Sequence, residues 1–207
     1  MKNFLAIDTS CDYFTAILSK DGEIYTCFLP DCAMKHSVSL MPAVDELLKK
    51  AEMTLDECDY FAAVVGAGSF TGIRIGVSAV KGMCLAFSKP ALPITSFDVA
   101  AYNAVDGKIL CLVDALHDSY YVCGYEEGKV VYPPAYLSEE EVLKLSGEYA
   151  LYACAPLPIS EKVNVTLVDP VKGLERAAIA LAKQDRFGDL TALYVRKSSA
   201  ELNLEGK

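Results

Sequence analysis

A glycine-rich segment that joins a buried apolar run to a helical pattern is the part of the chain best suited to holding an anion. It reads Gly66-Ala67-Gly68-Ser69-Phe70-Thr71-Gly72-Ile73-Arg74-Ile75-Gly76. Glycines let a backbone approach a ligand closely, and the first amides of a helix attract negative charge. The segment therefore has two features of a phosphate-binding loop.

The spacing of this segment does not fit three known loop motifs. A dinucleotide fingerprint needs glycine where Thr71 stands and an acidic residue about twenty positions later, near Lys89. A Walker loop needs lysine after its last glycine, where this chain has Ile73. A nucleophile elbow needs one residue between Gly68 and Ser69. On spacing alone, the glycine segment fits a tight structural turn as well as it fits a ligand-binding loop.

Two aspartates follow short buried runs and could flank a metal-bound nucleotide, as in duplicated phosphotransferases. They are Asp8, in Asp8-Thr9-Ser10, and Asp114. However, Asp12 and Asp118 add negative charge to the loops that would hold the phosphates. We therefore interpret Asp8, Thr9, Ser10 and Asp114 as relics of a nucleotide site.

The histidines do not predict a metal centre. His36 and His117 are the only two, and Leu40 stands where an H-x-x-x-H pair would need the second ligand. Cys32 with His36 is a weak pair without further ligands. We expect His36 to be packed or to cap a helix, and we expect no metal and no cofactor.

A repeat organises the elements that would position these residues. Lys2–Asp8 resembles Lys108–Asp114, which lies 106 residues later in the sequence. At the same offset Asp12 aligns with Asp118, and Gly22 aligns with Gly128. Both copies read as strand, aspartate, polar turn, strand, glycine turn and strand. A single repeat of this size predicts a duplicated subdomain, with chance similarity as the alternative. The predicted division is 1–105 and 106–207, with the tail packing back on the first part.

The remaining pattern alternates helices and strands, which predicts an α/β fold with mixed sheets. Expected helices cover about 37–51, 73–87, 96–105, 139–145 and 174–183, and expected strands cover 60–65, 92–95, 151–155 and 163–168. The helix after the glycine segment has a bulky apolar stripe and a second stripe of mostly small residues: Ile75, Ala79, Gly82 and Ala86. A helix apolar on two sides is usually covered on both. We expect another subunit on the second stripe, with the C-terminal segment as the alternative.

Composition predicts a globular, acidic chain. The sequence has 207 residues, 53% hydrophobic and 23% charged, with a formal net charge of −9. This balance excludes disorder and disfavours direct binding to a nucleic-acid backbone, which needs a basic patch. Eight cysteines without a C-x-x-C pair favour reduced thiols. No signal peptide and no apolar run of about 20 residues is evident, so we expect a cytoplasmic protein without a membrane role.

Several segments together resemble one family. They are Leu5–Ser10, His36–Leu48, the segment Gly66–Gly76, Ser96, Asp114-Ala115 with Tyr120-Tyr121, and Leu193–Glu201. In this order, over nearly the whole chain, they resemble the TsaB (YeaZ) family, and the glycine segment is the most specific part.

The resemblance implies an actin/Hsp70/sugar-kinase (ribonuclease H-like) fold of two duplicated subdomains. It also implies a role in making threonylcarbamoyladenosine on tRNAs that read A-starting codons. There the chain would be the non-catalytic partner of the transferase TsaD, whose H-x-x-x-H metal site it lacks. The ATPase TsaE would join the complex, nucleotide would be bound by the partners, and tRNA would be contacted only indirectly.

The resemblance further implies pairing through the helices near 37–51 and 72–87, as a homodimer when the chain is alone. The expected partner residues are His36, Leu40, Val44, Leu47, Ile75, Ala79, Gly82 and Ala86. Substituting Ala79 or Gly82 by arginine is expected to break association and leave the monomer folded.

Three features depart from the family pattern. Ala67 stands where many members of the family have the proline of a Gly-Pro-Gly sequence, and Leu116 stands where they commonly have an arginine. The chain is also somewhat short for the family.

Two other functions remain as alternatives. A small ATP-dependent phosphotransferase or ATPase would share the fold, and a metallopeptidase would need more histidines than this chain has.

Overall fold

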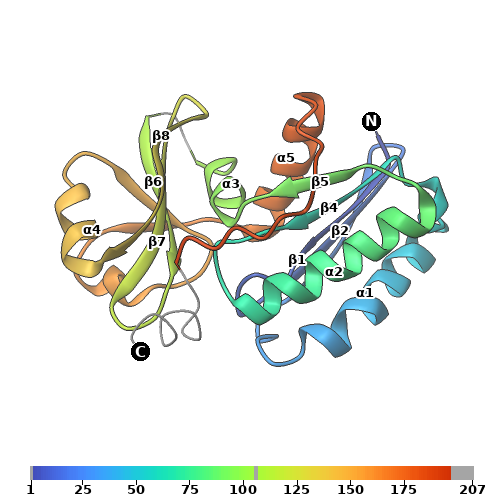
Figure 1. The fold of residues 1–207 in the computed structure, drawn as a ribbon, viewed down its shortest axis with the longest axis horizontal. Helices are drawn as coiled ribbons and strands as arrows, with labels where there is room; N and C mark the ends of the chain where they lie inside the picture. Colours follow the sequence, from blue (N-terminus) through green and yellow to red (C-terminus); the bar gives the residue numbers. More distant parts are fainter. Residues whose placement is uncertain (1, 105–106, 197–207) are drawn as a thin grey trace, which may run out of the picture.

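Two five-stranded mixed sheets lie side by side in the computed structural model, which describes residues 2–104 and 107–196 (Figure 1). The first sheet has the order β3-β2-β1-β4-β5. Its strands are β1 (Phe4–Asp8), β2 (Phe14–Lys20), β3 (Glu23–Leu29), β4 (Tyr60–Val64) and β5 (Ala91–Ile94). β1, β2 and β3 form an antiparallel meander, and β4 and β5 extend the sheet in parallel with β1.

The second sheet repeats this arrangement in the order β8-β7-β6-β9-β10. Its strands are β6 (Lys108–Asp114), β7 (Ser119–Glu126), β8 (Lys129–Ser138), β9 (Ala150–Ala153) and β10 (Val165–Leu167). β6 pairs antiparallel with β7 and parallel with β9, as β1 does with β2 and β4. The shared strand order agrees with the duplication predicted from the repeat. The predicted division at 105–106 lies outside the described residues.

Helices cover both faces of the first sheet. α1 (His36–Ala51) and α2 (Phe70–Phe87) pack on one face, where Leu5 and Ile7 of β1 point. α5 (Pro170–Lys183) packs on the other, where Phe4 and Ala6 point. This alternation follows from the two-residue period of a strand. α5 follows the second sheet in sequence but covers the first in space.

Short helices occupy the remaining connections. They are α3 (Ser96–Ala101), α4 (Glu139–Leu145) and the 3₁₀ turns Leu55–Glu57 and Pro158–Glu161. Capping boxes at Thr54 and Ser138 begin the turn Leu55–Glu57 and α4. α3 ends earlier than expected, at Ala101. α2 begins three residues earlier than expected, because the Ser69 hydroxyl accepts a hydrogen bond from the Gly72 amide and caps the helix.

The chain after α5 returns along the first sheet and then crosses to the second. We call residues 184–196 the strap, which is red in Figure 1. The Gly188 amide donates to the Ala91 carbonyl oxygen (3.0 Å), and the Leu193 amide donates to that of Val65 (2.7 Å). The strap therefore packs on the first subdomain, and residues 197–207 of the expected tail lie outside the described residues.

α2 is long and apolar enough to cross a membrane, with a mean hydropathy of 1.3 over 18 residues. A single such helix is weak support for a membrane span, because core helices pass the same test. Ile73, Val77, Val80 and Met83 of α2 are buried against the first sheet. This packing is that of a core helix with one covered side.

Candidate functional site

The glycine segment packs directly on the turn that follows β1. A methyl group added at Gly68 would overlap the carbonyl oxygen of Ser10, and one at Gly72 would overlap that of Thr9. At Gly76 it would overlap the Thr9 hydroxyl. Three glycines of the motif thus permit close contact between two backbone segments of this chain. This role favours the structural-turn interpretation of the segment.

The polar groups of both loops are engaged with each other. The Ser69 amide donates to the Ser10 carbonyl oxygen (2.8 Å), and the Thr9 hydroxyl donates to that of Gly72 (2.7 Å). The Ser10 amide and hydroxyl both donate to Asp8 Oδ1, at 2.8 and 2.7 Å. Backbone amides and hydroxyls are the donors that a phosphate would need. The four donors named above are used inside the chain.

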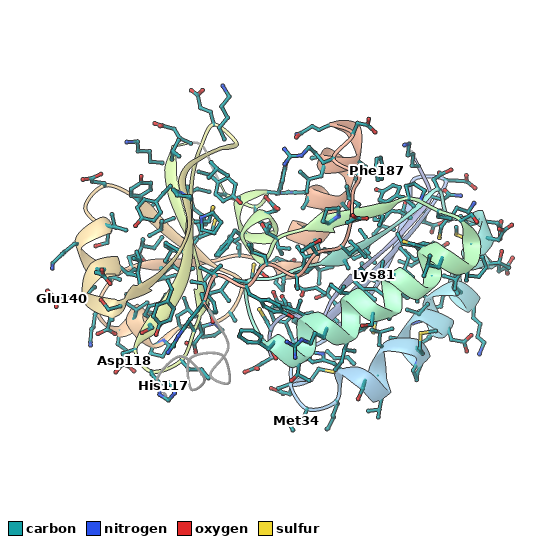
Figure 2. All side chains as sticks on the ribbon, in the orientation of Figure 1. Met34, Lys81, His117, Asp118, Glu140 and Phe187 are labelled. Atoms are coloured by element: carbon teal, nitrogen blue, oxygen red, sulfur yellow. The ribbon has the colours of Figure 1, made fainter. Side chains whose placement is uncertain are left out.

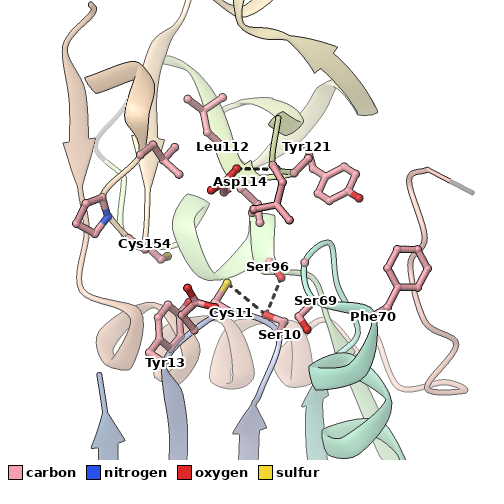
Figure 3. Close-up of a pocket in the computed structure, with 18 of the residues that line it drawn as sticks. Ser10, Cys11, Tyr13, Ser69, Phe70, Ser96, Leu112, Asp114, Tyr121 and Cys154 are labelled. Carbon is pink, nitrogen blue, oxygen red and sulfur yellow. Dashed lines mark hydrogen bonds between the residues drawn. The ribbon is translucent and has the colours of Figure 1, made fainter. Parts of the chain in front are cut away.

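A cavity of about 500 Å³ lies next to these loops, between the two subdomains (Figure 3). The residues lining it include Ser10, Cys11, Tyr13, Phe70, Asp114 and Cys154. The Ser10 and Ser96 hydroxyls face each other across 3.1 Å. Burial raises the pKa of the Cys11 thiol to about 12, so the thiol form dominates at neutral pH. Among the described residues, no group of three metal-binding side chains forms.

Asp8 and Asp114 have different environments. Asp8 is completely buried, and this burial raises the pKa of its carboxyl, although the Ser10 hydrogen bonds oppose the shift. Asp114 is exposed at the cavity, where its Oδ1 accepts a hydrogen bond from the Leu116 amide (2.7 Å). A raised pKa favours a neutral acid, which is a poor ligand for a metal-bound nucleotide. This contrast supports the interpretation of Asp8 as a relic.

The raised pKa of Asp8 predicts how an Asp8→Asn variant behaves. In the unfolded chain the carboxyl titrates near 3.8, and in the folded chain it titrates higher. The wild type therefore loses stability as the pH rises from the unfolded value through the folded pKa. The asparagine does not titrate, and its oxygen can still accept from Ser10. We expect the variant to gain stability relative to wild type as the pH rises above about 4, measured by urea unfolding. A relative loss over this range would show that Asp8 folds as a carboxylate.

The structure corrects the expected partner residues on α1. His36, Leu40, Val44 and Leu47 are at most 2% exposed, and the three aliphatic residues pack in the core of the first subdomain. His36 Nε2 lies 2.9 Å from the Cys11 carbonyl oxygen, at the start of α1. These side chains therefore support α1 from within and present no surface to a partner.

The residues expected on α2 divide into two pairs. Ile75 and Ala79 are half-buried and pack against the core of the first subdomain. Gly82 and Ala86 are exposed, and a methyl group added at Gly82 would meet no atom within 4 Å. Among the described residues the strap does not cover Gly82, and the rest of the C-terminal segment lies outside the described residues.

Large apolar side chains that sequence analysis did not assign are exposed on and beside these helices. Met34 is 94% exposed and points away from the body of the chain (Figure 2), Val38 is 69% exposed, and Leu85 is 83% exposed. Met41 is 51% exposed. We call Met34, Val38, Met41, Gly82, Leu85 and Ala86 the outer face. The stripe Val38 and Met41, opposite the buried stripe of α1, was the available sequence signal.

Comparison with known proteins links the chain to tRNA modification. A family model described as TsaD, tRNA N6-adenosine threonylcarbamoyltransferase, matches residues 22–192. The tRNA threonylcarbamoyladenosine biosynthesis protein TsaB of Bacillus subtilis is 31% identical over 124 residues, which cover 59% of this chain and 54% of that protein. TsaB of Escherichia coli is 28% identical over 159 residues, which cover 70% and 68%.

The chain spans about half the length of some curated relatives. The match covers 47% of TsaB of Buchnera aphidicola from Schizaphis graminum, at 32% identity over 48% of this chain. Among solved structures, YeaZ from Pseudomonas aeruginosa has a TM-score of 0.75 at 21% identity, covering 94% of this chain and 100% of that one. This likeness confirms the predicted fold.

Proposed function

Because the chain belongs to the tRNA N6-adenosine threonylcarbamoyltransferase (TsaD) family, in its TsaB/YeaZ branch, we propose that it is a non-catalytic partner of a TsaD transferase. In this role it assists the formation of threonylcarbamoyladenosine in tRNAs that read A-starting codons. The chain contributes a docking surface, and the transferase contributes the chemistry.

The exposed apolar outer face is the observation that carries this proposal. Val38 and Leu85 lie on neighbouring helices that cover the same side of the first sheet, and both are more than two-thirds exposed. Large exposed apolar side chains on one side of a chain are typical of protein interfaces. We propose that TsaD binds there, and that a second copy of the chain binds there when TsaD is absent.

The interior of the fold supports a non-catalytic role. The Ser69 amide and the Thr9 hydroxyl join the two loops. Both Ser10 donors bind Asp8, which is completely buried. These features weigh against the phosphotransferase alternative. The net charge of −9 supports an indirect contact with tRNA through the partners. TsaE would join through the TsaD complex, and we expect the complex in the cytoplasm.

The test is reconstitution with TsaD and TsaE from the same cell. Transfer of the threonylcarbamoyl group to tRNA is measured with the chain, without it, and with the chain alone. We expect transfer only when TsaD and this chain are both present. Transfer by the chain alone, or full transfer by TsaD without it, would contradict the proposal.

A further inference from the structure

Two segments far apart in the sequence form one aromatic cluster at the start of α2. The Phe70 and Tyr194 rings stack with centroids 4.6 Å apart and planes 13° apart. Arg74 Nε donates a hydrogen bond to the Tyr194 hydroxyl (2.9 Å). The Arg74 guanidinium also lies 5.6 Å from the centre of the Tyr194 ring. The strap thus supplies one ring, and the glycine segment supplies a second ring and the cation.

The strap is anchored on both sides of this cluster. Before Tyr194, the Leu193 amide donates to the Val65 carbonyl oxygen at the end of β4 (2.7 Å). After Tyr194, Arg196 Nη1 donates to the Tyr136 hydroxyl of β8 (3.0 Å), and its guanidinium lies 4.7 Å from the centre of that ring. Figure 1 shows the strap crossing from the first subdomain to the second. Tyr194 therefore links α2 to a segment held by both subdomains.

The first turn of α2 needs such support. Its initial amides have no partners within the helix, and Ser69 caps only the Gly72 amide. Gly72 and Gly76 pack against the turn after β1 on the buried side of the helix, whereas the Tyr194 cluster supplies contacts on the exposed side, which carries Arg74. Stacked aromatic pairs contribute about 0.5–1.5 kcal/mol beyond their buried area, and cation–π contacts add to this.

We propose that Tyr194 is a positioning residue that locks the first turn of α2 to the strap through Phe70 and Arg74, and so holds in place the helix that carries Gly82, Leu85 and Ala86 of the outer face. The inference rests on the proposed function, because it names what sets the affinity of that face. A turn that frays in the free chain must be ordered on binding, and this ordering lowers affinity.

The experiment compares Tyr194→Ala and Arg74→Gln with the control Tyr149→Ala. Tyr149 also lies under a cation, Lys108, but it is half-buried and belongs to the second subdomain. Hydrogen exchange of the amides of residues 70–78 reports on the turn, and calorimetry with purified TsaD reports on affinity. We expect both test variants to exchange about tenfold faster in this turn and to bind TsaD about tenfold more weakly. The control should match wild type in both measurements.

Each outcome decides the inference. Unchanged exchange in residues 70–78, or unchanged affinity despite faster exchange, would overturn it. Arg74 is exposed, so Arg74→Gln gives the answer if Tyr194→Ala does not fold. Equal effects in the Tyr149→Ala control would show a general loss of stability and would also overturn it. If wild type does not bind TsaD, the proposed function fails, and the exchange data alone then decide whether Tyr194 locks the turn.

Discussion

Replacing Gly72 with alanine should destabilise the folded chain by about 3 kcal/mol or more. The added methyl group would overlap the Thr9 carbonyl oxygen, and both sides of this contact are backbone. Backbone cannot swing away as the end of a flexible side chain can, so α2 would have to separate from the turn after β1. Urea unfolding, followed by circular dichroism, measures the change.

Gly82 of the same helix provides the matched control. An added methyl group there meets no atom, and alanine is the better helix former, so Gly82→Ala should stabilise the chain by about 0.5–1 kcal/mol. Opposite signs for the same substitution on one helix would separate contact from helix propensity. If Gly72→Ala is as stable as wild type, the close packing described for the glycine segment is wrong.

Replacing Gly82 with arginine should weaken binding to TsaD by about 100-fold or more, because a long charged side chain would enter the centre of a packed contact. The monomer should stay folded, since Gly82 is exposed with open space around it. Light scattering after size exclusion, with and without TsaD, measures the loss of complex.

Gly188→Arg is the control for this experiment, because Gly188 is equally exposed and unobstructed but lies on the strap. It should leave binding unchanged. The structure makes Ala79→Arg a poorer test than the sequence indicates, since Ala79 packs partly against the core of the first subdomain and its arginine variant would also disturb the monomer. Unchanged binding by Gly82→Arg would move the interface away from the outer face.

Much of the fold could be predicted because local patterns and tertiary packing agree. The meander β1, β2 and β3 follows from two apolar runs around Asp21-Gly22, and its recurrence at Lys108 predicts the second sheet. The start of α2 could not be placed from apolar periodicity, because its first turn contains Phe70, Thr71 and Gly72 and is defined by the Ser69 cap. The position of α5 on the first sheet also could not be predicted from the local sequence pattern, because long-range packing determines it.

The candidate site was predicted only in part. The glycine segment could be singled out from its spacing, but its contact with Thr9 joins residues that are more than 60 positions apart. The partner residues expected on α1 lie on its buried side, because an apolar stripe such as Leu40, Val44 and Leu47 has the same sequence pattern whether it covers a sheet or a partner. Val38 and Met41 form the opposite stripe, and only the sheet's position distinguishes the two.

The duplication is unequal in a way that limits how many chains can assemble. In the described part of the chain, the first copy carries the long helices α1 and α2, whereas the second copy has the seven-residue α4, whose exposed residues include Glu140, Glu141 and Lys144. Two complementary docking surfaces at opposite ends of one molecule would allow head-to-tail growth into a filament. With one such surface, we expect association through the outer face to close at two chains, and a transferase and a second copy to compete for the same place.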